Sequence, residues 1–406
     1  MSRKTAFIII IVIVLILLGV LFWLYSSQSE KDGGMFGEFP TSPIFPGGGS
    51  GGEEEPTEEQ GGGTFTENPR LLNKISETPV AGASIFSKTE DDEETVYIRH
   101  VDRGIGNIFE TDLRTLEQIR ISNKTIPKVY EALWKNDGSE VILRYLDESE
   151  RIISFHAEIS DELPEEETLQ GTFLPQGIPH IAVSPDSSSI FYISPNSGGS
   201  TGITADFDGG GRSQIWSSPL REWLPSWASL STVALFSKPG FAVAGSLFFV
   251  NNQNGAVRNI LNDVSGLTAL PNPDGTLILL SSGDRTGLST SVLTVSDGKT
   301  ENFLTTTMPE KCVWSREETS TVYCAVPITL PQAAYPDEWY KGKVSFLDDI
   351  WKIDVETGLS EFVANLKSES GEEIDAIELK LSPNEDYLIF TNKKDLSLWS
   401  LKLENL

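Results

Sequence analysis

A unit of two short apolar segments joined by a polar turn recurs along this chain, and it limits the fold more than any other feature. In one clear copy, Ala269-Leu270 leads through Asn272-Pro273-Asp274-Gly275 to Leu277-Ile278-Leu279. Proline presets φ, aspartate bonds the local backbone and glycine accepts a positive φ, so this tetrapeptide predicts a tight turn between two strands. Related units begin near Leu133, Ala182 and Leu379, with degenerate copies around Trp227 and Trp314.

A third strand follows several of these units, and a short turn and a fourth strand complete them. Third strands are predicted over residues 107–113, 214–216, 349–355 and 398–401. The equivalent positions Trp134, Ser184, Trp227, Asn272, Trp314 and Ser382 are 50, 43, 45, 42 and 68 residues apart. Four-stranded units at about 40–45 residues are typical of β-propellers. We therefore predict an all-β fold, a seven-bladed β-propeller of four-stranded antiparallel blades.

The two ends of the repeat region are predicted to meet in one blade. The segment Leu71–Ser76 resembles the outer-strand segment Leu116–Ser122, so the first complete blade begins near Val80–Phe86. The last unit stops after its third strand, at Leu401–Leu403, and residues of about 70–76 supply the missing outer strand. This pairing would close the ring and remove an exposed sheet edge.

The Pro-Asp-Gly-like turns, together with the third-strand segment Asp349-Ile350-Trp351-Lys352-Ile353-Asp354-Val355 and the Thr357-Gly358 turn, resemble the TolB-type propeller repeat, a relative of the tryptophan–aspartate (WD) repeats. The resemblance covers most of residues 70–403. It implies an extracytoplasmic protein-binding platform, or a propeller attached to a hydrolase. This chain differs from that pattern because it has an N-terminal apolar segment and a glycine-rich spacer, and because no second folded domain is predicted.

Ahead of the repeats, Ala6–Leu24 is a run of 19 uncharged, almost wholly apolar residues. A helix of this length measures roughly 29 Å, close to the hydrocarbon thickness of a bilayer. Arg3 and Lys4 precede it, so we predict a single-pass signal anchor, with a cytoplasmic tail over residues 1–5 and a transmembrane helix over 6–25. The alternative is a cleaved signal peptide, but the run exceeds the usual apolar core of about 7–15 residues and no Ala-x-Ala-like site follows.

Residues 26–64 are rich in glycine, proline and glutamate, and cannot bury enough apolar surface to fold. We predict a disordered linker there, and the β-propeller over residues 65–406. About 40 flexible residues reach roughly 35 Å on average. The predicted organisation is thus an anchor, a spacer and a head.

The chain is strongly acidic, with 59 Asp and Glu against 31 Lys and Arg and a net charge of −28. Because Arg3 and Lys4 contribute +2 and are the only charges before residue 26, residues 26–406 carry −30. Such a surface repels phosphate backbones, so we expect no nucleic-acid partner. The expected partner is an envelope or extracellular protein, with a glycan as the alternative. The head is expected to be monomeric and extracytoplasmic, facing the periplasm or the exterior of the cell membrane.

The two cysteines, Cys312 and Cys324, flank a predicted hairpin whose turn is Arg316–Thr319. On antiparallel strands they would lie opposite each other, and an oxidising exterior permits a disulfide between them. The alternative is a pair of reduced, buried cysteines.

Two long connections are predicted between second and third strands, over residues 195–212 in blade three and 327–349 in blade six. In a propeller these connections share one face, and function usually lies on such loops. The second connection holds four aromatic residues: Tyr335, Trp339, Tyr340 and Phe346. Exposed aromatic side chains of this kind anchor a partner. The alternative is that they pack the loop onto its own blade.

The first connection holds Asp206 and Asp208 ahead of Gly209–Gly211. Alternating carboxylates with glycine suit a hard cation such as Ca²⁺. The full twelve-residue calcium-loop pattern is absent, so a solvated loop is the alternative, and no other cofactor is predicted.

No catalytic residue is predicted, since His100, His156 and His180 lack the spacing of a zinc site. The favoured interpretation is a membrane-tethered extracytoplasmic propeller that acts as a protein-binding or scaffold module of the cell envelope. The alternatives are a propeller-type carbohydrate-active enzyme, either a glycan hydrolase or a lyase, and a structural subunit of an envelope assembly. An enzyme would require paired carboxylates in the central pocket with perturbed pKa values.

Overall fold

The structure, a computed structural model, describes residues 71–90, 93–159 and 169–403, which lie within the compact unit Glu67–Leu406. The predicted transmembrane helix over 6–25 and linker over 26–64 lie outside the described residues. Across the described ranges, no helix is long and apolar enough to cross a membrane.

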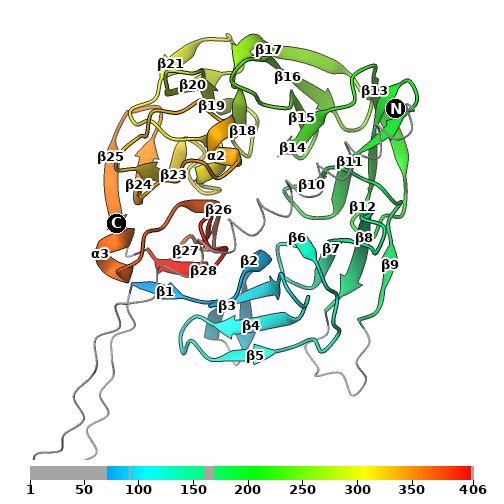
Figure 1. The fold of residues 1–406 in the computed structure, drawn as a ribbon, viewed down its shortest axis with the longest axis vertical. Helices are drawn as coiled ribbons and strands as arrows, with labels where there is room; N and C mark the ends of the chain where they lie inside the picture. Colours follow the sequence, from blue (N-terminus) through cyan, green and yellow to red (C-terminus); the bar gives the residue numbers. More distant parts are fainter. Residues whose placement is uncertain (1–70, 91–92, 160–168, 404–406) are drawn as a thin grey trace, which may run out of the picture. The chain divides into compact units, whose positions relative to one another are not determined.

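The described residues form seven four-stranded antiparallel sheets that follow one another around a ring (Figure 1). In blades one to six the strands pair in chain order. Blades one to three contain β2 (Val80–Glu90), β3 (Glu93–Asp102), β4 (Ile108–Asp112), β5 (Gln118–Arg120), β6 (Val129–Trp134), β7 (Glu140–Leu146), β8 (Ile152–Glu158), β9 (Gly171–Phe173), β10 (Ile181–Val183), β11 (Ser189–Asn196), β12 (Gly199–Asp206) and β13 (Ser213–Ser218).

Blades four to six contain β14 (Trp223–Ser229), β15 (Thr232–Ser237), β16 (Ala244–Asn251), β17 (Val257–Ser265), β18 (Thr268–Pro271), β19 (Leu277–Gly283), β20 (Leu288–Thr294), β21 (Thr300–Asn302), β22 (Cys312–Trp314), β23 (Thr321–Pro327), β24 (Asp348–Asp354) and β25 (Ser360–Asn365). Three short helical segments accompany the blades: η1 (Pro309–Lys311), α2 (Asp337–Tyr340) and α3 (Leu366–Ser370).

Blade seven joins both ends of the described chain. Its sheet runs β26 (Ala376–Leu381), β27 (Tyr387–Asn392), β28 (Leu398–Lys402) and then β1 (Leu72–Lys74). Leu72 pairs with Leu401, and Lys74 with Trp399. The predicted ring closure and the all-β seven-bladed propeller are therefore confirmed.

The apolar core consists of layers between neighbouring blades. Each of seven clusters in the described residues draws side chains from two adjacent sheets, as where Val101 of blade one packs with Val129 and Leu143 of blade two. An eighth cluster combines side chains of the connection between β23 and β24 with Met308, which precedes η1. Strands with alternating burial thus hold the blades face to face, since successive side chains of a strand point to opposite faces.

The connection predicted over residues 195–212 is largely a strand. Asn196 pairs with Gly199, so β11 and β12 form a tight hairpin, and residues 214–216 belong to the fourth strand of blade three instead of the third. This prediction was wrong because β12 reads as a Gly/Ser/Thr-rich loop, although Ile203 and Ala205 pack into the core between blades two and three.

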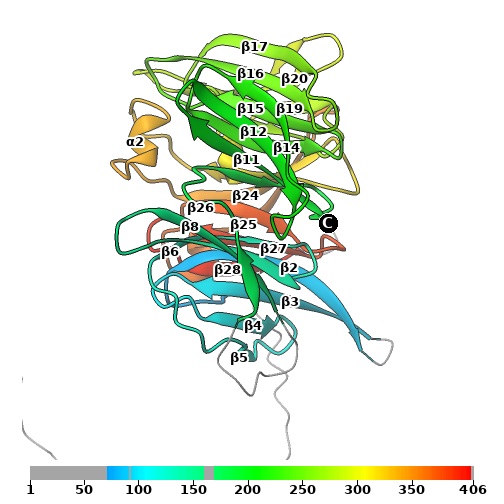
Figure 2. The same ribbon diagram turned by 90° about the vertical axis from the view of Figure 1, so that its right-hand side faces the viewer.

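The connection predicted over residues 327–349 is confirmed as a long excursion between β23 and β24, and we call residues 328–347 the long loop. Its short helix α2 stands out on one side of the blades (Figure 2). We call this side the loop face. The turns between first and second strands lie on the opposite side, the turn face.

The two cysteines lie directly opposite each other in blade six, because Cys312 of β22 pairs with Cys324 of β23. In the structure their sulfur atoms are bonded at 2.11 Å. The disulfide therefore joins the two innermost strands of this blade, next to the base of the long loop.

Candidate functional site

The long loop has a hydrophobic core of its own. Three of its four aromatic residues are buried, with exposed fractions of 0% for Tyr335, 2% for Trp339 and 1% for Phe346. The rings of Trp339 and Phe346 stack at 5.9 Å between centroids, and Met308 and Ala333 complete the cluster. The burial that the alternative interpretation of the sequence expected is observed, but the side chains pack within the loop and against Met308, not onto the strands of blade six.

A buried charge network fixes the base of the long loop. The fully buried Lys311 donates from Nζ to Asp348 Oδ2 at 2.7 Å and to Asp375 Oδ1 at 2.5 Å. Asp375 Oδ2 also accepts from the Trp339 indole N–H and from the Phe346 backbone N–H, both at 3.0 Å. Blades six and seven are therefore joined to the loop through one carboxylate.

The two carboxyl groups of this network respond differently to their surroundings. Burial raises the pKa of Asp348 to about 6, although Lys311 favours its charged form. Burial also opposes ionisation of Asp375, yet Lys311 and the donors from Phe346 and Trp339 bring its pKa below the usual value. Sequence reasoning missed all three charged residues, which lie in different strands and connections and share no motif.

The long loop also contacts blades four, five and seven. The backbone N–H of Phe241 in blade four donates to Asp337 Oδ2 at 2.7 Å, and Lys393 Nζ of blade seven donates to the Trp339 carbonyl at 2.7 Å. In blade five, a Cβ added at Gly283 would lie 2.5 Å from the Tyr335 carbonyl oxygen. Glycine is therefore required for the close approach of the two backbones. The loop is a rigid bridge over the loop face.

Three large side chains of the long loop are exposed to solvent. Tyr340 is 43% exposed, Ile328 48% and Leu330 37%. Although part of Tyr340 is exposed, its hydroxyl lies against the protein, where it donates a short hydrogen bond to Glu310 Oε1; burial of the hydroxyl and then this carboxylate raise the pKa of the phenol. Of the four predicted anchors, Tyr340 is the one presented to solvent, and the binding role of all four stays a prediction. We call Tyr340, Ile328 and Leu330 the platform.

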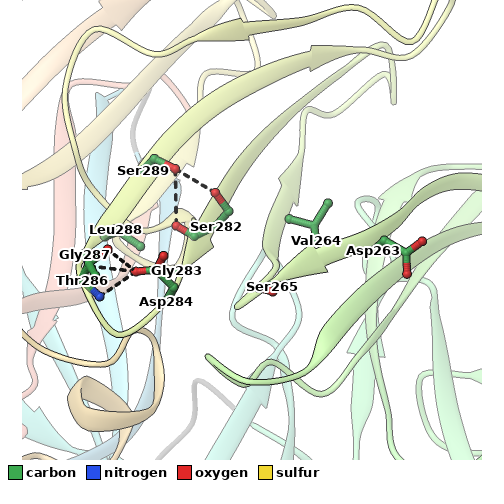
Figure 3. A pocket seen from close by; sticks show the side chains of 10 residues that line it. All are labelled: Asp263, Val264, Ser265, Ser282, Gly283, Asp284, Thr286, Gly287, Leu288 and Ser289. Carbon is green, nitrogen blue, oxygen red and sulfur yellow. Dashed lines mark hydrogen bonds between the residues drawn. The ribbon is translucent and has the colours of Figure 1, made fainter.

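A surface groove of about 500 Å³ lies beside the long loop, between the end of β17 and the β19–β20 hairpin (Figure 3). Ser282 and Ser289 face each other with their hydroxyls 2.7 Å apart. Asp284 Oδ1 accepts from the backbone and hydroxyl of Thr286. These bonds commit the polar groups to the hairpin's own structure, and the Asp284 carbonyl accepts from the Tyr335 N–H at 3.1 Å. The groove thus lies next to the long loop, and the hairpin that lines the groove is hydrogen-bonded to that loop.

The central channel contains a cluster of interacting charges. Glu378 and Lys380 of β26 keep solvent-exposed surface, although protein atoms surround their charged groups, and Glu131 of β6 interacts electrostatically with both. Burial, then Glu131, raises the pKa of Glu378, and burial lowers the pKa of Lys380. Glu378 has a φ of 55°, a strained conformation for a residue other than glycine. A carboxyl group with a raised pKa in a cleft is a candidate for acid–base chemistry.

The carboxylates proposed for a cation lie on the turn face. Asp206 ends β12 and Asp208 follows in the turn to β13, where its Oδ1 accepts from the Gly210 N–H at 2.7 Å. Both side chains are exposed, and the part of the chain that the structure describes contains no group of three or more His, Cys, Asp or Glu able to hold a metal ion. A Ca²⁺ role for these two residues stays a prediction.

No family model and no curated protein matches this chain. Solved structures do resemble it. An oligogalacturonate lyase from Vibrio parahaemolyticus matches with a TM-score of 0.53 at 12% identity, over 84% of this chain and 95% of that chain. An oligogalacturonate lyase in complex with manganese matches with a TM-score of 0.50 at 12% identity, over 81% and 97%. A chain of a mitotic checkpoint complex gives 0.50 at 10%, over 82% and 94%.

Proteins of different function thus share this architecture. At such identities the likeness shows the seven-bladed propeller fold alone. The TolB-type repeat remains a resemblance carried by the turn and strand motifs.

Proposed function

We propose that this protein is a membrane-tethered, extracytoplasmic β-propeller that binds a protein partner of the cell envelope through the platform. The observation that carries the proposal is the rigid construction of the long loop. Its base is fixed by a buried ion network, its interior is aromatic, and it bridges four blades. Binding costs less entropy when the contacting surface is already ordered.

The exposed residues of the platform suit a protein partner. Tyrosine at the centre of an interface often contributes a large share of the binding energy. Ile328 and Leu330 add apolar area on the same loop. The apolar run Ala6–Leu24 supports the tether, and the net charge of −28 supports a partner with a basic surface.

One labelling experiment tests both the location and the binding face. The full chain carrying Tyr340→Cys is expressed in cells, and a membrane-impermeant thiol-to-amine crosslinker is added to intact cells, after outer-membrane permeabilisation where one exists. The matched control is Leu230→Cys, because Leu230 is 65% exposed in the β14–β15 turn on the turn face. We expect both cysteines to react and only Tyr340→Cys to form one discrete crosslinked species.

Two results would contradict the proposal. If both cysteines react only after cell lysis, the head is not extracytoplasmic. If Tyr340→Cys reacts but yields the same products as Leu230→Cys, the platform is not the binding face.

A second candidate function rests on the charges of the central channel. Glu378, with its raised pKa, and the neighbouring Glu131 and Lys380 could serve a carbohydrate-active enzyme, either a hydrolase or a lyase. Turnover of a polysaccharide by the full chain, lost in Glu378→Gln and kept in the surface control Glu361→Gln, would favour this alternative.

A further inference from the structure

A cavity of about 400 Å³ lies at the centre of the ring, on the turn face. All seven blades contribute to its lining through their first strands and the turns that follow them. The turn residues Asn136, Pro185 and Arg316 form part of its rim. The cavity is therefore separate from the platform, which lies on the opposite face.

Three tryptophans at equivalent repeat positions line this cavity, in blades two, four and six. Trp134 Nε1 donates to the Gly82 carbonyl at 3.3 Å, and Trp314 Nε1 to the Leu270 carbonyl at 3.0 Å. Each of these two indoles thus bonds the first strand of the preceding blade. Trp227 Nε1 is buried and has no hydrogen-bond partner among the described residues. The pairing register of β14 also shifts between Trp227 and Ser229.

The buried Trp227 N–H has no solvent-accessible surface, so it does not open into the cavity, and Trp227 lines the cavity with its other atoms. The three indole rings offer flat apolar surfaces to a bound molecule.

The charged residues lining the cavity are both cationic, in a chain with nearly twice as many acidic as basic residues. Lys380 Nζ donates to the Ala83 carbonyl at 2.6 Å, and Arg316 Nη2 to the Leu381 carbonyl at 3.0 Å, which leaves further donors on each group. Glu378 and Glu131 interact with Lys380 from within the channel. Glu385 lies near the rim, where it accepts from the Arg316 backbone N–H at 2.6 Å and from the Ser315 hydroxyl at 2.7 Å.

We propose that this cavity binds a small organic anion with a flat apolar body, of the aryl carboxylate class. The carboxylate is held by Lys380 and Arg316, and the ring packs against the tryptophans. This site is independent of the proposed platform, so failure of one leaves the other standing.

The test is calorimetric titration of the purified full chain with benzoate, 2-naphthoate and indole-3-acetate. We expect saturable one-to-one binding of at least one of them, and binding of its neutral amide at least about tenfold weaker. Trp227→Leu removes an aromatic ring from the cavity wall, and should weaken binding about fivefold. The matched control Trp351→Leu changes a tryptophan of β24 that does not line the cavity, and should leave the affinity unchanged.

The charge contribution is tested by Lys380→Met and, because that change could disturb folding, by the surface change Arg316→Gln. Each should weaken binding of the carboxylate at least about fivefold and leave binding of the amide unchanged. The proposal is overturned if no probe binds at about 1 mM, a concentration that detects affinities near −4 kcal/mol. It is equally overturned if the amide binds as well as the acid, or if Trp227→Leu and Trp351→Leu behave alike.

Discussion

At the scale of single residues, His100 links the stability of blade one to pH. Its side chain is buried and stacks on Phe109 at 5.4 Å between ring centroids. Burial lowers the pKa of His100 to about 4, although Asp102 acts in the opposite direction. Between pH 4 and about 6.5, the unfolded chain therefore binds more protons at this residue than the folded chain. Its contribution to the free energy of unfolding is complete above pH 6.5 and is lost as the pH falls.

We expect His100→Phe to reduce the acid sensitivity of the fold. Because of this histidine, the free energy of unfolding should fall by about 2 kcal/mol when the pH is lowered from 7 to 5. The His100→Phe variant should not show this loss. Urea unfolding at the two pH values measures the difference. Asp348 has a raised pKa and therefore makes the folded protein more stable as the pH falls, opposite to His100. The effect of His100 is therefore measured as the difference between the variant and the natural chain. Ile98→Val is the control, because it weakens the same blade equally at both pH values. If His100→Phe and the natural chain show the same pH dependence, His100 is not the source of the acid sensitivity.

At the scale of elements, the long loop depends on one close backbone contact with blade five. We expect Gly283→Ala to destabilise the protein by about 1–3 kcal/mol, because the new Cβ would lie 2.5 Å from the Tyr335 carbonyl oxygen. Gly287→Ala is the matched control in the same hairpin, since a Cβ there would meet nothing within 4 Å. Thermal unfolding measures stability, and the Tyr340→Cys crosslink, introduced into each variant, reports on the platform. Similar melting of the two variants would mean that the loop is not held at this point.

Strands joined by turns with characteristic turn-forming residues were predictable from the sequence. Gly275 has a φ of 72° and its N–H bonds the Asn272 carbonyl at 3.0 Å, as the Asn-Pro-Asp-Gly segment indicated. The closing strand was predictable because its residues repeat an outer-strand pattern. Strand β12 was not, because its Gly, Ser and Thr residues lack an apolar run and gain their strand conformation from pairing with β11.

The candidate site was predictable only in outline. The position of the long loop and its aromatic content could be read from the sequence, but the direction of each ring could not. Burial of Trp339 depends on Asp375, which lies 36 residues away along the chain. No local pattern relates Lys311 to its partners Asp348 and Asp375, because folding alone brings them together. The same holds for the channel charges.

At the scale of the whole molecule, the pairing of β1 with β28 holds the ring closed. We expect Leu72→Asp to lower the free energy of unfolding by several kcal/mol, because Leu72 is 4% exposed and a carboxylate there would be buried without a partner. The neighbouring Leu71→Asp is the control, since Leu71 is 38% exposed. Denaturant unfolding of the full chain gives both values. If Leu72→Asp is no worse than Leu71→Asp, β1 contributes little to closure.

The same pairing has a consequence for biosynthesis. A ribosome makes β1 before every other strand of the ring and β28 after all of them, so β1 waits for its partner through the synthesis of the other six blades. Contacts between residues this distant in the chain form slowly, because closing a long loop carries an entropic cost. Each interblade layer can assemble as its two sheets emerge, whereas the final blade can be completed only once translation is nearly over. A nascent chain released early would therefore carry an assembled arc with β1 still unpaired, the form most exposed to aggregation and to quality-control proteases.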